Sequence, residues 1–248
     1  QRAPGRAAGP RRAGAAAVRR VEKKSPTAET PLVIPGYVRW FDYPDGDVKS
    51  RAVEYFAKRR IYDLDSFEWG ISNYAIHHGS FIIFPVVHNG VLRSYQMRTL
   101  YDGGAKTLSA SPDKGWVKTS DCLYNYDSVP PLSPVIVTEG PAKAVRVGGV
   151  GLFGSAVSAE QAKLVSHKRP SEVVVWLDRD ASAKSAKVAE ILLRAGLPVS
   201  VVGWWDCPDL RANDPNDVDD DTLERMYEGR VRINGRIDLV TFLIRSCT

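Results

Sequence analysis

The second half of the chain alternates short apolar runs with segments of helical periodicity. The apolar runs predict strands, at residues 135–138, 150–153, 173–177 and 199–202. The intervening and following segments predict helices, at residues 142–147, 159–167, 181–195 and 219–228. Gly196 and Pro198 follow the longest of these helices and are typical of a helix end. Strands that alternate with helices predict a parallel sheet with helical crossovers, which is an α/β fold.

The region before residue 131 has a different pattern. A helix with an apolar face is predicted at about 48–60, with Asp47 as its N-cap. Apolar runs at 81–87 and 91–100 predict two strands. They flank Asn89-Gly90, a pair that tolerates the positive φ angles of a tight hairpin. Residues 61–74 are expected to form a loop or a short helix. Residues 102–131 are expected to form mainly loops. This region therefore reads as α+β.

Proline-rich and basic stretches divide the chain into four predicted parts. They are a basic Ala/Pro/Arg-rich tail or linker, an α+β subdomain, a parallel-sheet domain and a C-terminal extension, at residues 1–36, 37–131, 132–229 and 230–248. Pro130, Pro131 and Pro134 mark the boundary between the second and third parts. Apolar residues in the extension predict a final core helix, and a partner-docking surface is the alternative interpretation.

The positive charge of the chain is concentrated in its tail. Residues 1–24 hold eight Lys and Arg residues against one Glu, which is +7, whereas the whole chain carries +5. The remainder is therefore slightly acidic. The tail has no apolar periodicity, so we expect it to be disordered when alone. It suits a solvated linker, a nucleic-acid-binding arm or an organellar transit peptide.

Several classes of protein are disfavoured by composition. No run of 18 apolar residues exists, so no membrane association is expected. Cys122, Cys207 and Cys247 are scattered and form no zinc-binding spacing, so no zinc is expected in this chain. Few cysteines fit a reducing compartment, and a cytoplasmic location is expected.

Acidic residues follow the predicted strands. Glu139 comes after the run at 135–138, Asp178 and Asp180 come after the run at 173–177, and Asp214 and Asp217 follow the last strand. In a parallel sheet, ligands bind beyond the carboxyl ends of the strands, so these carboxylates can meet. Each alone also suits a helix cap. Together they require cations, and hard oxygen ligands suit Mg²⁺ or Mn²⁺. We therefore predict a metal site.

These motifs resemble a TOPRIM domain, the metal-binding fold of bacterial-type primases, topoisomerases and related nucleases. Glu139-Gly140 and Asp178-Arg179-Asp180 match its Glu and Asp-x-Asp motifs. Asp214-Pro215-Asn216-Asp217 resembles a later motif of primases, and Phe81–Val86 resembles the strand that ends in Phe-Pro-Ile. Residues 48–229 are therefore similar, in motifs and in their order, to the catalytic core of bacterial and phage DNA primases.

The resemblance implies a fold and an activity. The fold is a TOPRIM-type parallel-sheet domain preceded by a smaller α+β primase N-terminal subdomain and the basic tail. The activity is Mg²⁺-dependent synthesis of RNA primers from ribonucleoside triphosphates on single-stranded DNA. The resemblance assigns catalysis to Glu139, Asp178 and Asp180, with Asp214 and Asp217 as further metal ligands. Arg98, Lys106 and Lys143 would bind nucleotide or template, a replicative helicase is a further expected partner, and the setting would be a nucleoid or phage replication site.

The sequence also departs from the family pattern. Lys143 stands where the family usually has Asp, so a cation replaces an expected metal ligand and can occupy the place of a metal ion. Two alternatives to a primase therefore stay open. One is a TOPRIM nuclease that uses the same carboxylates to cleave nucleic acid. The other is a catalytically degenerate primase core that binds DNA or a replisome component.

Overall fold

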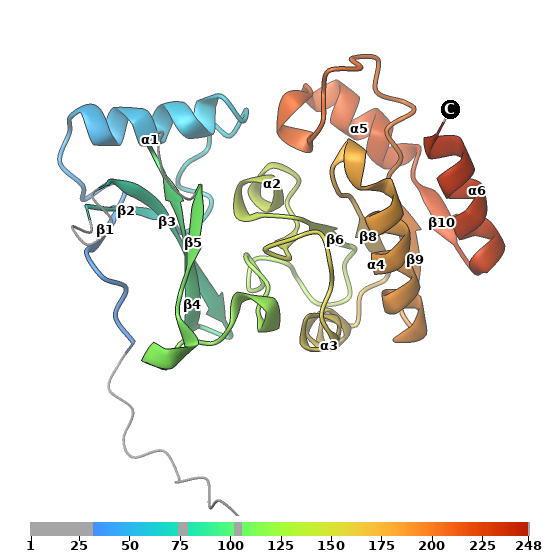
Figure 1. The fold of residues 1–248 in the computed structure, drawn as a ribbon, viewed down its shortest axis with the longest axis horizontal. Coiled ribbons are helices and arrows are strands. Elements are labelled where there is room, and N and C mark those ends of the chain that lie inside the picture. The colour runs from blue at the N-terminus through green and yellow to red at the C-terminus, as the bar shows by residue number, and fades with distance from the viewer. Residues whose placement is uncertain (1–31, 74–78, 102–105, 248) are drawn as a thin grey trace, which may run out of the picture. The chain divides into compact units, whose positions relative to one another are not determined.

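The computed structural model describes residues 32–73, 79–101 and 106–247, and most of the predicted tail lies outside them. Residues 32–248 form one compact unit with two five-stranded sheets (Figure 1). The first sheet has the strand order β1-β2-β3-β4-β5 and is antiparallel throughout. Its strands are β1 (Tyr37–Arg39), β2 (Gly70–Ser72), β3 (Phe81–His88), β4 (Val91–Thr99) and β5 (Thr107–Ser109).

Alternation along β3 gives this sheet two buried faces. Ile82 and Phe84 pack on one side against α1 (Asp47–Ala57), while Phe81 and Ile83 face a second cluster around Trp116. The predicted hairpin between β3 and β4 is confirmed, because Asn89 and Gly90 both have positive φ, at 54° and 72°. A strand with two covered faces shows a nearly continuous apolar run, as the sequence does here.

The start of α1 differs from the prediction. The N-cap is Gly46, whose φ of 153° any larger side chain would strain, and it provides no side-chain cap. Asp47 lies in the first helical turn instead, where its carboxylate accepts a hydrogen bond from Arg51 Nε at 2.8 Å. A carboxylate in the first turn still favours the helix through the dipole.

The second sheet has the order β10-β9-β8-β6-β7. Its strands are β6 (Val135–Thr138), β7 (Val150–Gly151), β8 (Val173–Val175), β9 (Val199–Val201) and β10 (Val231–Ile233). The four predicted strands are parallel to one another, as expected. The structure adds β10, which the sequence did not predict and which pairs antiparallel with β9. The predicted parallel sheet is thus mixed at one edge.

Helices cover both faces of the second sheet. They are α2 (Pro141–Arg146), α3 (Ala159–His167), α4 (Ser182–Arg194), α5 (Asp220–Glu228) and α6 (Arg236–Ser246). Val137, Val175 and their neighbours belong to a core cluster with α3, α4 and α6. Val174 and Trp176 belong to another with α5. Figure 1 shows the carboxyl ends of these strands leading toward α2 and α5.

The short helix α2 connects the packing of the two sheets. Ala142 and Ala144 are buried in the same cluster as Phe56 of α1 and Tyr124. The Tyr124 backbone also exchanges two hydrogen bonds with Gly151 at the edge of the second sheet, at 3.0 and 3.2 Å. These contacts fix α2 between the sheets. Lys143, between the two buried alanines, is not part of this cluster.

The C-terminal helix is partly a core helix. Leu239 and Phe242 of α6 are buried, which confirms the core prediction for these two positions, whereas Ile237, Val240 and Ile244 are exposed. Across the described residues, no helix has the length and apolar character needed to span a membrane.

Candidate functional site

Three of the predicted carboxylates meet beyond the strand ends. Glu139 directly follows β6 and precedes α2. Asp178 follows β8 and begins the 3-10 helix Arg179–Ala181. Asp214 begins the 3-10 helix Pro215–Asp217, where its Oδ1 accepts a hydrogen bond from the Asn216 N–H. Parallel strands from one sheet bring the first two together, and the loop after β9 brings the third.

The ammonium group of Lys143 lies at the point these carboxylates share. Its Nζ donates to both carboxylate oxygens of Asp178. The same atom lies 3.8 Å from Glu139 Oε2 and 3.8 Å from Asp214 Oδ2. Lys143 and Asp178 are buried to a similar degree, with 16% and 15% of their side chains exposed. The cluster is therefore a partly buried salt-bridge network around one lysine.

The pKa of Asp178 is raised by its position in this network. Burial raises its pKa to about 6, and the neighbouring charges of Glu139 and Asp214 add to the increase. Lys143 acts in the opposite direction, through its hydrogen bonds and its charge. Because the pKa still lies above the ordinary value of 3.8, desolvation outweighs the lysine, and the site disfavours the charged form of Asp178.

The other two predicted ligands lie apart from this network. Asp180 is exposed, and within the described part of the chain it forms no ion pair with Lys143. Asp217 is also exposed, and its Oδ2 accepts hydrogen bonds from the N–H groups of Asn213 and Asp214 at 2.8 and 3.0 Å. Asp217 thus stabilises the loop that presents Asp214. A direct metal-binding role for either residue stays a prediction.

The residue types of the cluster suit one divalent ion, but the present positions of their side chains do not form a site for it. Three carboxylates and one ammonium group leave a net charge of −2, and carboxylate oxygens are the ligands that Mg²⁺ and Mn²⁺ prefer. However, Lys143 fills the shared point. Among residues 32–73, 79–101 and 106–247, no group of three or more Asp, Glu, His or Cys side chains is arranged to hold a metal. Accepting an ion therefore requires side chains to move.

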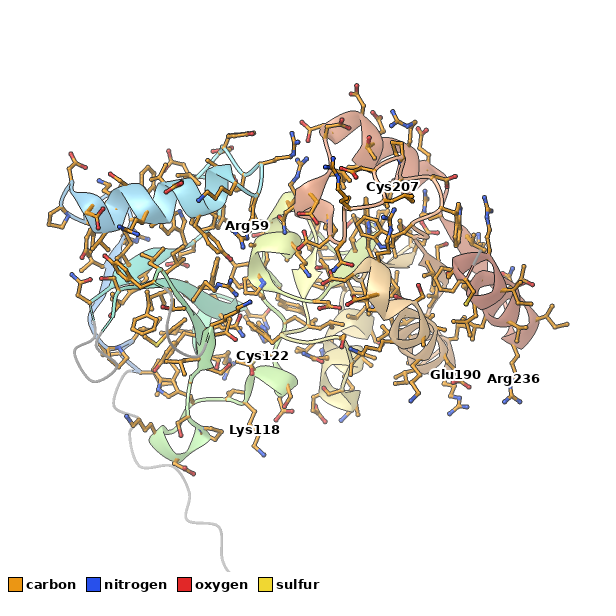
Figure 2. All side chains as sticks on the ribbon, turned by 45° about the horizontal axis from the view of Figure 1, so that its top comes forward. Arg59, Lys118, Cys122, Glu190, Cys207 and Arg236 are labelled. Carbon is orange, nitrogen blue, oxygen red and sulfur yellow. The ribbon has the colours of Figure 1, made fainter. Side chains whose placement is uncertain are left out.

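Cations from the first sheet and its helix lie beside the acidic cluster. Tyr55 of α1 is in contact with Arg59, whose guanidinium lies 3.7 Å from the ring centre, and Arg98 of β4 lies 5.8 Å away. Burial raises the pKa of Tyr55, and the charges that also act on it are Arg59, Arg98, Asp214 and Lys143. Tyr55 therefore contacts Arg59, lies near Arg98 and is within electrostatic range of Asp214 and Lys143. Figure 2 shows Arg59 where the end of α1 approaches α2.

We call Arg59 and Arg98 the basic wall, and sequence reasoning found only part of it. It predicted Arg98 and Lys106, and the structure places Lys106 as an exposed residue just before β5. It missed Arg59 and Tyr55. The signal was the triplet Lys58-Arg59-Arg60 at the end of the predicted helix, because several neighbouring cations favour the binding of phosphates.

The fold is similar to those of several solved primase structures. The Escherichia coli primase catalytic core matches with a TM-score of 0.57 at 18% identity, over 82% of this chain and 78% of that chain. The chain has the fold of a bacterial primase catalytic core. The DnaG primase catalytic domain bound to single-stranded DNA matches with a TM-score of 0.58 at 18% identity, over 82% of this chain and 77% of that chain.

A third structure, of the Aquifex aeolicus primase zinc-binding and RNA polymerase domains, gives a TM-score of 0.52 at 20% identity, over 62% of this chain and 41% of that chain. No family model matches the sequence, and no curated protein matches it significantly. The resemblance inferred from the motifs is therefore confirmed for the fold, and activity must be argued from the site.

Proposed function

We propose that this primase-fold chain is a nucleotidyltransferase core that synthesises short RNA primers on single-stranded DNA. The observation that carries the proposal is the meeting of Glu139, Asp178 and Asp214 beside Arg59 and Arg98. Carboxylates opposite a basic wall are suited to a reaction between phosphates. The basic wall would bind the negative DNA backbone and the triphosphate. The carboxylates would hold the cation that acts on the reacting oxygens.

The residues of the chain have separable roles in this proposal. Glu139 and Asp214, with Asp178, would hold a divalent ion. When bound, such an ion would neutralise phosphate charge and lower the pKa of an attacking hydroxyl. Arg59 and Arg98 would orient the triphosphate or the template by charge-assisted hydrogen bonds. Lys106, exposed beside β5, would extend the basic surface.

The likeness to a primase domain bound to single-stranded DNA supports that choice of template. The proposed partners are thus single-stranded DNA and ribonucleoside triphosphates. A helicase partner and a nucleoid or phage replication setting stay predictions from the sequence resemblance.

Primer synthesis on homopolymeric single-stranded templates tests the proposal, with Mg²⁺ and Mn²⁺ in parallel. We expect Glu139→Gln to lower dinucleotide formation by about 100-fold or more, because it removes a charge at the reacting centre. Glu190→Gln is the matched control, since Glu190 is partly exposed on α4 and pairs only with Arg194 at 2.7 Å among the described residues (Figure 2). Equal activity of Glu139→Gln and the unmodified chain would refute the catalytic role. Shortened DNA without triphosphates would indicate a nuclease.

Template binding is measured separately. We expect Arg59→Ala to weaken the affinity for labelled single-stranded DNA several-fold and to reduce its salt dependence. Arg236→Ala removes the same charge from the exposed start of α6, away from Arg59 in Figure 2, and should leave the affinity unchanged. Equal losses in both variants would argue against a specific basic wall.

A second function is favoured by one observation. Lys143 fills the shared point of the carboxylates, which suits a degenerate core that binds DNA without catalysis. That function predicts normal affinity for single-stranded DNA together with no primer synthesis in Mg²⁺ or Mn²⁺.

A further inference from the structure

The position of Lys143 is set by the packing of α2. Its neighbours Ala142 and Ala144 are buried against the cluster that contains Phe56, so α2 cannot rotate without opening that core. Lys143 projects from the other side of the helix and reaches Asp178 with both of that residue's oxygens as acceptors. The lysine is therefore a built part of the site and not a mobile surface cation.

The lysine also lies close to carboxylates from three separate segments. Nζ is 3.8 Å from Glu139, which precedes α2, and 3.8 Å from Asp214, in the loop after β9. Such a convergence of partly buried carboxylates is stable only when a cation neutralises it. In this chain, the protein supplies one such cation itself.

Charge then limits how many ions the site can take. Glu139, Asp178 and Asp214 with Lys143 carry a net charge of −2, which one divalent ion balances. An acidic residue at position 143 would make it −4, which two divalent ions balance. We propose that the Lys143 ammonium stands in the place of one divalent cation, so that this site binds a single ion beside it. This inference rests on the proposed function only in what the bound ion is for. The number of ions is measured without substrate, so it can be tested separately.

A binding experiment on the full chain tests the inference. Mn²⁺ is titrated in the absence of DNA and nucleotides, and free Mn²⁺ is followed by electron paramagnetic resonance. We expect one high-affinity ion for the unmodified chain and two for Lys143→Asp. Lys187→Asp makes the same charge change at an exposed position of α4 and should keep one ion. Two ions or none in the unmodified chain, or one ion in Lys143→Asp, would overturn the inference.

A neutral variant covers the case in which Lys143→Asp does not fold. Lys143→Met keeps an unbranched side chain that is one heavy atom shorter and removes the ammonium charge, so we expect it to bind Mn²⁺ at least tenfold more tightly than the unmodified chain. Unchanged or weaker affinity in Lys143→Met would overturn the inference. A chain that binds one ion but makes no primer would refute the proposed function while leaving this inference in place.

Discussion

Replacing Asp178 by Asn should stabilise the protein in the absence of metal. A pKa of about 6 in place of the ordinary 3.8 means that folding disfavours the charged carboxylate by about 3 kcal/mol at neutral pH. The neutral amide of Asn resembles the protonated acid and avoids this cost. Its carbonyl oxygen can still accept a hydrogen bond from Lys143. We therefore expect Asp178→Asn to raise the free energy of unfolding by about 3 kcal/mol at pH 7.5.

The pH dependence of this difference identifies its cause. Between pH 3.8 and about 6 the folded protein binds a proton at Asp178 that the unfolded chain releases, so stability falls as pH rises through that range. Asp178→Asn lacks this slope, and its advantage should disappear toward pH 4. Urea unfolding in EDTA across this range measures both effects, and Asp63→Asn, at an exposed loop position, is the control. A less stable Asn variant at pH 7.5 would mean that the Lys143 ion pair outweighs burial, contrary to this reasoning.

Two further predictions concern buried positions elsewhere in the fold. Burial lowers the pKa of His88, whose ring contacts the Leu123 carbonyl, so the folded protein binds this proton less readily than the unfolded chain. Stability should therefore fall as pH drops below about 6.5; His88→Gln should remove that part of the slope in urea unfolding, and an unchanged slope would contradict the assignment. Gly149→Ala places a Cβ 2.4 Å from the Ile136 carbonyl oxygen, and we expect unfolding in urea to show a loss of about 1–3 kcal/mol. Gly154→Ala, where a Cβ meets open space, is its control, and equal stability of the two variants would refute the packing argument.

The elements that the sequence predicted well are those whose signal is local. The strands β3 and β4 carry long apolar runs, and the Asn89-Gly90 turn fixes their pairing by its own conformational preference. The helix α3 spans the predicted residues 159–167, and the structure shows that Ser158 and Gln161 form a capping box within four residues at its start. In both cases, the residues that determine the structure are neighbours in the chain.

The elements that were missed depend on distant partners. The strands β1, β2, β5 and β10 have three residues each and lack a continuous apolar run, and they exist because a neighbouring strand offers hydrogen bonds. Dependence on distant partners also explains why the roles of the site residues could not be read from the sequence. The resemblance placed Asp217 among the metal ligands, and only the folded loop shows its carboxylate accepting hydrogen bonds from two backbone N–H groups.

The energetic cost at Asp178 and the ion count at Lys143 are linked. A carboxylate that costs about 3 kcal/mol when charged weakens the fold unless something that binds the folded state offsets the loss. One bound ion at a hundred times its Kd adds about 2.7 kcal/mol, which is of the same size. Mn²⁺ at that concentration should therefore bring the unmodified chain close to the stability of Asp178→Asn in EDTA. If Mn²⁺ raises the unfolding midpoint of Asp178→Asn as much as that of the unmodified chain, the ion sits elsewhere, and Asp178 is not part of the site that holds it.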